Sequence, residues 1–215
     1  MTPHPRLGFS HIRALSGPAY VEPRRLVHWN HADTTRRNHR TYFRGTCRDL
    51  GRESIADVAA ATFPLACPPD STSADVAAFI EATLTAERFS EYLTDPTRIV
   101  LKASVDGEIV GYLMAIDAPP EDPEIAEMIT ARPAIEISKF YVLPGRHGTG
   151  VSKALMAAIV ELGRSAGHAG LWLGVNQQNA RARRFYAKEG FDVVGERTFT
   201  VGSQIHDDHV MQRTL

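Results

Sequence analysis

The chain has few cysteines, no long apolar run and no internal repeat. Cys47 and Cys67 are its two cysteines among 215 residues, too few for a disulfide framework, so we expect a protein of the reducing cytoplasm. No apolar run approaches the roughly 18 to 20 residues that cross a bilayer, so no membrane partner is expected. The length and the ordinary composition, 43% hydrophobic and 23% charged, predict one globular domain with an appended segment.

Acidic residues are scarce at the start of the chain. Residues 1–40 carry a formal charge of +5, with seven arginines against Glu22 and Asp33, whereas residues 41–215 carry −6. The acidic balance of residues 41–215 argues against nucleic acid as a partner. Residues 1–40 show no sustained period and lack the apolar region of a secretory signal. We interpret them as a disordered basic extension, or an over-long start, before a domain at 41–215. Their histidines show no metal-ligand spacing.

Hydrophobic periodicity in residues 41–215 predicts a mixed α/β domain. The expected helices are 53–63, 71 or 73 to 94, 151–163 and 180–188, and the expected strands are 41–46, 98–104, 108–116, 134–143, 171–175, 191–201 and 206–215. Asp106-Gly107 between two of these strands is a hairpin signal. Residues 134–175 are typical of a right-handed parallel β-α-β unit. This order predicts a mixed central sheet with helices on both faces.

A glycine-rich turn without acidic residues follows the strand that ends at Pro144. The helical pattern resumes at Val151, so backbone N–H groups and the positive end of a helix dipole face the turn. Glycines allow close approach, and the combination favours a bound anion. The spacing is neither that of a dinucleotide fold nor that of a P-loop, which disfavours a nucleotide-binding regulator.

Three motifs in order extend this turn. They are Tyr141-Val142-Leu143-Pro144, then His147-Gly148-Thr149-Gly150-Val151-Ser152, then Asn179-x-x-Ala182-x-x-Phe185-Tyr186-x-x-x-Gly190-Phe191. Over residues 41–215 they resemble the GNAT acetyltransferase superfamily. The family loop usually reads Gln/Arg-x-x-Gly-x-Gly/Ala, so His147 and Ser152 depart from it. An imidazole at the first place would make its charge contribution depend on pH.

The resemblance implies acetyl-coenzyme A as the acetyl donor. It implies that the strand ending at Val142 splays from the strand containing Trp172 and leaves a slot for the pantetheine arm. The pyrophosphate would lie on the N–H groups of the turn. The cofactor-binding residues implied are Tyr141, Val142, His147, Gly148, Thr149, Gly150, Val151, Ser152 and Asn179.

Transfer to an amine needs a base for the amine and a proton donor for the departing thiolate. The resemblance makes Tyr186 the donor candidate, and the alternative is a packed aromatic side chain beside Phe185. Glu136 is the base candidate, and the alternatives are a salt bridge to Lys139 or an edge location. Strict alternation places Glu136, Ser138 and Phe140 on one face of their strand. His168 and His206 are lesser base candidates, expected at the surface.

The amine acceptor is less strongly indicated. Residues 62–69 and 199–211 resemble PaiA-type polyamine acetyltransferases, and the acidic run within 117–127, together with Asp207 and Asp208, suits a small cationic amine. The alternative for the acidic run is an ordinary solvated surface. Rival hypotheses are a protein or peptide amino-group acetyltransferase and a non-catalytic acyl-coenzyme A sensor. We expect a monomer or a homodimer.

Overall fold

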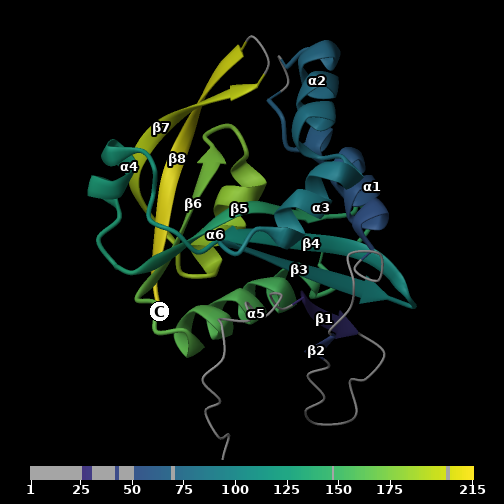
Figure 1. Ribbon diagram of the computed structural model, residues 1–215. Coiled ribbons are helices and arrows are strands. Elements are labelled where there is room, and N and C mark those ends of the chain that lie inside the picture. The colour runs from purple at the N-terminus through teal and green to yellow at the C-terminus, as the bar shows by residue number, and fades with distance from the viewer. Residues whose placement is uncertain (1–25, 31–41, 44–50, 69–70, 147, 202–203) are drawn as a thin grey trace, which may run out of the picture.

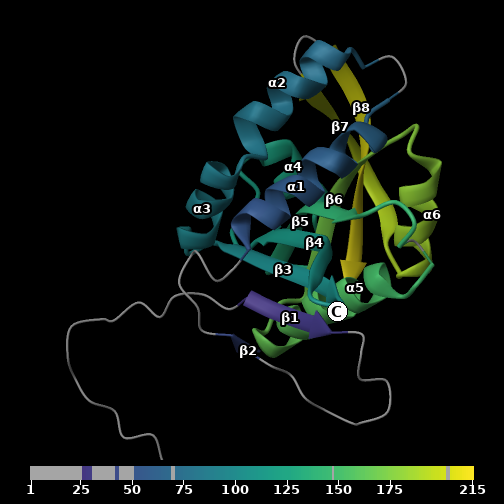
Figure 2. The same ribbon diagram turned by 90° about the vertical axis from the view of Figure 1, so that its right-hand side faces the viewer.

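The computed structural model describes residues 26–30, 42–43, 51–68, 71–146, 148–201 and 204–215. Over these residues, eight strands form one sheet in the order β2-β1-β3-β4-β5-β6-β8-β7, with helices on both faces (Figures 1 and 2). The strands are β1 (Leu26–Asn30), β2 (Tyr42–Phe43), β3 (Arg98–Val105), β4 (Glu108–Ile116), β5 (Ala134–Val142), β6 (Gly170–Asn176), β7 (Asp192–Val201) and β8 (Gln204–Thr214). The helices are α1 (Arg52–Thr62), α2 (Ser73–Thr83), α3 (Ala86–Thr94), α4 (Pro123–Met128), α5 (Val151–Ser165) and α6 (Ala180–Lys188), with a 3-10 turn, η1, at Phe63–Leu65.

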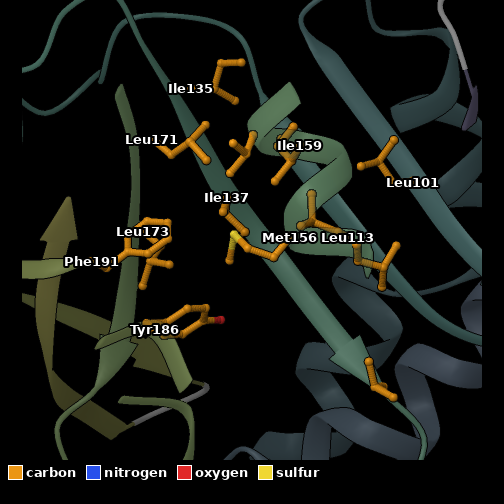
Figure 3. Packing of buried hydrophobic residues seen from close by; sticks show 14 of the residues in the cluster. Leu101, Leu113, Ile135, Ile137, Met156, Ile159, Leu171, Leu173, Tyr186 and Phe191 are labelled. Carbon is orange, nitrogen blue, oxygen red and sulfur yellow. The ribbon is translucent and has the colours of Figure 1, made fainter. Parts of the chain in front are cut away.

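The sheet buries apolar side chains on both faces, as a central sheet between helices requires. On one face α5 packs against β3 to β6, and Met156 and Ile159 of this helix meet Ile135, Ile137 and Leu171 (Figure 3). On the other face α1 and α3 cover β3 and β4 around a second apolar cluster. The mixed sheet with helices on both faces, predicted from the sequence, is therefore confirmed.

The local turn chemistry explains how the strands are joined. Asp106 and Gly107 both adopt positive φ, 54° and 87°, the geometry of a two-residue hairpin turn. They connect β3 and β4 as an antiparallel pair. Strands β5 and β6 are parallel, with α5 between them in the chain. Both pairings agree with the sequence prediction.

Two helical segments differ from the prediction by more than a shift of one or two residues at their ends. The single helix expected up to residue 94 is two helices, because the chain leaves helical geometry at Leu84 and Thr85 starts α3 by accepting a hydrogen bond from Arg88 N at 3.3 Å. The acidic segment 117–133 contains a short helix, α4, capped by Asp122. Helices α3 and α4 each begin at a capping residue, Thr85 and Asp122. A capping side chain can start a helix where the spacing of apolar residues alone does not indicate one. No helix among the described residues is long and apolar enough to cross a membrane.

The sheet begins before residue 41. Strand β1 pairs in parallel with β3 and antiparallel with β2, so the domain boundary drawn from the sequence does not coincide with the start of the sheet. A five-residue strand is too short to give a periodic signal, and its pairing partners lie far along the chain. The rest of the predicted extension, residues 1–25 and 31–40, lies outside the described residues, as does most of the predicted strand 41–46.

A β-bulge at Ser138 interrupts the alternation of β5. Met114 pairs with Lys139 while the next residue, Ala115, pairs with Ile137, which leaves Ser138 as the extra residue. A bulge shifts the following side chains to the opposite face. Phe140 consequently joins the core on the α5 side. The predicted placement of Phe140 on the same face as Glu136 is therefore wrong, because single-sequence alternation does not show the extra residue.

Replacing Leu155 with alanine should destabilise the fold by about 2–5 kcal/mol, since its side chain is 2% exposed within the α5 core. Chemical denaturation monitored by circular dichroism measures this change. Lys153→Ala, at an exposed position of the same helix, should change stability by less than about 0.5 kcal/mol. Equal effects of the two variants would contradict the packing of α5.

Candidate active site

Strands β5 and β6 pair over three residues each and then diverge. Residues 134–136 pair with residues 170–172, and beyond them a cavity of about 190 Å³ opens between the strands. We call this cavity the slot. Its lining comes from β5 (Ile137, Ser138, Phe140, Tyr141), β6 (Gly174, Val175, Asn176), the α6 region (Asn179, Ala182, Tyr186), the β7–β8 hairpin (Arg197, Phe199, Val201, His206, Asp208) and residues Phe63, Ala66, Cys67 and Pro68. The predicted splay of the two strands is confirmed.

A larger cavity of about 450 Å³ lies beside the slot. We call it the acidic cavity. It is lined by Phe63, Phe79, Leu84, Asp122, Glu124, Ile125, Met128, Glu136, Ser138, Lys139, Tyr141, Glu196, Arg197, Thr198 and Phe199. Because Phe63, Ser138, Tyr141, Arg197 and Phe199 line both cavities, the two cavities share a wall at the bulge of β5.

The glycine turn after β5 has an open backbone. Gly145, Gly148 and Gly150 adopt φ of 80°, 81° and 91°, and a Cβ at any of them would meet nothing within 4 Å. Gly150 is the N-cap of α5 and offers no side-chain acceptor, so the first amides of this helix keep their hydrogen-bonding capacity for an anion. Residues 148–152 line neither cavity, and His147 lies outside the described residues.

Tyr186 extends from α6 toward β5, with its hydroxyl leading (Figure 3). Its ring packs edge-on against Phe185 and Phe191, with centroids 5.5 and 5.8 Å apart. Burial raises the pKa of the phenol well above its ordinary value, so the hydroxyl keeps its proton at neutral pH. The ring is therefore packed among aromatic side chains, as one alternative expects, and the same side chain lines the slot with a protonated phenol.

Glu136 lies at the point where β5 and β6 part. It pairs with Trp172 of β6 and lines the acidic cavity, not the slot. Burial raises the pKa of its carboxyl group, while the nearby positive charges of Arg197, Lys139 and Arg98 act in the opposite direction. Strand β5 runs between β4 and β6, so the alternative of an edge location is excluded.

Asn179 contributes to the position of Tyr186 through the helix that both residues share. Its side-chain oxygen accepts a hydrogen bond from Ala182 N at 3.0 Å, which makes it the N-cap of α6. The residue also lines the slot together with Tyr141 and Tyr186. Of the other predicted cofactor residues, Val142 is buried in the α5-side core and lines neither cavity.

The two lesser histidine candidates are not surface residues, so that expectation is wrong. His206 is 8% exposed, lines the slot and has no hydrogen-bond partner for Nε2 among the described residues. The His168 side chain is 10% exposed and its Nε2 lies 3.2 Å from Asp117 Oδ1, away from both cavities. His206 lies in β8 and His168 follows the end of α5. Both are covered by elements distant in the sequence, so their burial could not be predicted from the local pattern.

Arg197 and Asp208 form an ionic pair that was not singled out together from the sequence. Arg197 Nε lies 3.9 Å from Asp208 Oδ2, and the two residues are cross-strand partners in β7 and β8. Arg197 lies two residues before Phe199 and four before Val201. Because alternate residues of a strand share a face, this spacing could have indicated from the sequence that Arg197 lies on the same face of β7 as Phe199 and Val201.

Asn179→Ala should lower stability by about 1 kcal/mol, because the amide of Ala182 loses its capping partner. Asn179→Asp keeps a capping oxygen and should lose less. Thermal unfolding of the three proteins measures the difference. Equal stability of Asn179→Ala and the parent chain would show that the cap contributes nothing.

Comparison with known proteins places this geometry in a family. The family model described as "Acetyltransferase (GNAT) family" matches residues 59–191. An uncharacterized N-acetyltransferase of Mycobacterium tuberculosis is 47% identical over 163 residues, which cover 76% of this chain and 97% of that protein.

Solved structures show the same fold at low identity. The PaiA N-acetyltransferase of Thermoplasma acidophilum, in complex with coenzyme A, matches with a TM-score of 0.62 and 16% identity, over 80% of this chain and 97% of that one. The ribosomal-protein-S18-alanine N-acetyltransferase of Escherichia coli matches with a TM-score of 0.54 and 14% identity, over 76% and 86% of the two chains. The chain therefore belongs to the GNAT acetyltransferase family and is an N-acetyltransferase that uses acetyl-coenzyme A as co-substrate.

Proposed function

We propose that this enzyme acetylates a small cationic amine such as a polyamine. The observation that carries the proposal is the lining of the acidic cavity. Asp122, Glu124, Glu136 and Glu196 contribute carboxylates, against the two cations Lys139 and Arg197. An excess of negative charge beside the slot attracts an ammonium group and raises its local concentration.

Aromatic rings line the same cavity. Phe63 and Phe79 stack with centroids 4.3 Å apart, and Phe79 meets Phe199 edge-on at 6.0 Å. Ring faces attract cations, and their edges pack against methylene groups. An amine with an aliphatic chain fits a cavity that offers carboxylates and rings together.

The donor would bind along the slot and the glycine turn. The open backbone at Gly148 and Gly150 and the uncapped start of α5 suit a pyrophosphate, with residues 147–152 around it. The edge of β5 that β6 leaves unpaired, near Tyr141 and Val142, suits the amides of the pantetheine arm. Asn179 lines this path. When bound, acetyl-coenzyme A supplies an activated acetyl group.

Two residues would move protons during transfer. Glu136 would take the proton that the amine must lose before it attacks, directly or through water, and burial raises the pKa of its carboxyl group, which strengthens it as a base. Tyr186 would hold its proton until the thiolate departs, because its pKa is far above neutrality. Glu136 lines the acidic cavity and Tyr186 lines the slot, so the amine would enter from one cavity and the thioester from the other, and the two would meet where the cavities adjoin.

The acceptor class is tested by the rate of coenzyme A release from acetyl-coenzyme A with a panel of amines. Spermidine and spermine should exceed an uncharged amine analogue and a peptide with a free N-terminus. If another amine or the peptide is acetylated and the polyamines give only background, the proposed acceptor is wrong. If none of these amines gives turnover while acetyl-coenzyme A binds, the proposed acceptor is likewise wrong.

The charge of the acidic cavity has its own test in the same assay. The double variant Asp122→Asn/Glu124→Gln should raise KM for spermidine about 2- to 10-fold, the modest effect expected for two exposed charges. Glu127→Gln, in the same helix but outside the cavity lining, should leave KM unchanged. Equal KM values for both variants would remove the role of the cavity carboxylates.

Glu136→Gln and Tyr186→Phe should each lower kcat about 10²- to 10⁴-fold. Glu136 acts as a base only as a carboxylate, so activity of the parent enzyme should fall as the pH drops through its raised pKa. The residual activity of Glu136→Gln should lack that acidic limb. A pH profile of kcat/KM for the three proteins measures this, and a full rate with Tyr186→Phe would reject its donor role.

A further inference from the structure

Arg197 occupies the wall between the two cavities. Glu136 lines only the acidic cavity and Asp208 lines only the slot, whereas Arg197 lines both. Its side chain is 22% exposed and that of Asp208 is 8% exposed. The structure therefore places one guanidinium between the half-buried carboxylate of Glu136 and the buried carboxylate of Asp208, which line different cavities.

Three contacts hold the guanidinium there. Its Nε lies 3.9 Å from Asp208 Oδ2, and its Cζ lies 5.8 Å from the centre of the Trp172 ring, a cation–π distance. Gly174 lies beneath it so closely that a Cβ at this position would overlap Nη2, Cζ and Nε. A glycine in β6 is thus what leaves room for the arginine.

The guanidinium is held in place, but its Nε–H group makes no hydrogen bond with the described residues. Nε is buried and has no hydrogen-bond partner among the described residues, since the ion pair with Asp208 is longer than a hydrogen bond. A buried donor without a partner is costly. The site therefore retains donor capacity on the wall where the amine and the acetyl group would meet.

Charge links Arg197 to both carboxylates. Burial raises the pKa of Glu136 and of Asp208, and in each case Arg197 is the strongest opposing influence. The other charges acting on Glu136 are Lys139, Arg98 and Glu121, with Asp122, Glu124 and Glu196 in the same cavity. Those acting on Asp208 are His206 and Asp207, with a hydrogen bond from Asn176.

We propose that Arg197 is the positioning residue of this site, which holds Glu136 and Asp208 as a pair of carboxylates on either side of the reacting amine. The proposal rests on the proposed function, because it needs Glu136 as the base. Arg197 need not touch the substrate. It keeps Glu136 able to accept a proton from the amine on the side of the acidic cavity, and it keeps Asp208 charged on the side of the slot.

The first test is the pH profile of kcat/KM for spermidine, or for the fastest amine of the panel. Arg197→Met removes the cation, so the pKa of Glu136 should rise and the acidic limb should move to higher pH by about one unit. Arg197→Lys keeps the positive charge, so the acidic limb should return close to its position in the parent enzyme. The full rate should not return, because an ammonium group lacks the planar set of N–H donors of a guanidinium. Arg213→Met removes the same charge outside both cavities and should leave the limb in place.

Gly174→Ala tests the same idea without removing a charge. The added methyl group would displace the guanidinium, so the limb should move in the same direction as in Arg197→Met. A uniform loss of rate at every pH, with an unmoved limb in both variants, would mean that Arg197 is merely structural and would overturn the proposal.

A second readout needs no turnover. Trp172 is 2% exposed, pairs with Glu136 and lies under Arg197, and Trp29→Phe would leave it as the single tryptophan of two. Its fluorescence should change as Glu136 titrates, with a midpoint about one unit higher in Arg197→Met. An unmoved midpoint rejects the role of Arg197. A full rate with Glu136→Gln would reject Glu136 as the base whether or not the midpoint moves, whereas the acceptor class is decided by the amine panel alone.

Discussion

The site depends on where the hydrogen bonding between β5 and β6 stops. Parallel strands normally continue their ladder, and an unpaired backbone edge inside a protein is costly. Here pairing ends after residue 136 of β5 and residue 172 of β6, and the slot begins. Both sides of the opening are rigid, because β5 is still paired with β4 and β6 with β8. The edge left open on β5 is the surface that a ligand with amide groups would complete.

The bulge at Ser138 lies at the same point. The bulge changes which face of β5 the following side chains lie on. Phe140 packs against the α5-side core, whereas Lys139 and Tyr141 line the acidic cavity. Glu136 lies two residues before the bulge, and Ser138 lines both cavities. One irregular residue thus places a carboxylate on one side and the slot on the other, which is why the two cavities meet where they do.

Elements with strong local signals were predicted from the sequence. The Asp106-Gly107 turn needs two residues that tolerate positive φ, and α6 begins at a capping asparagine and ends before Gly190. The order of strands and helices followed from such signals. The candidate site residues Tyr186 and Asn179, which the family motif indicated, both line the slot. Their roles remain proposals.

The features that the sequence did not reveal depend on distant pairing. The bulge requires the register of β4 against β5, and the burial of His206 requires the whole of β8 between β6 and β7. The position of Arg197 depends on a glycine in β6, 23 residues earlier in the chain. A single sequence carries periodicities but not registers, so it predicts which residues share a strand and not which ones meet across the sheet.

The most direct test of this account is a crystal structure of the protein with coenzyme A. We expect the pyrophosphate on the backbone amides between Gly148 and Ser152, the arm along the open edge of β5, and the sulfur in the slot beside Tyr186, facing the wall that carries Arg197. A sulfur atom outside the slot, or a pyrophosphate away from the glycine turn, would contradict the claim that the divergence of β5 and β6 builds the site.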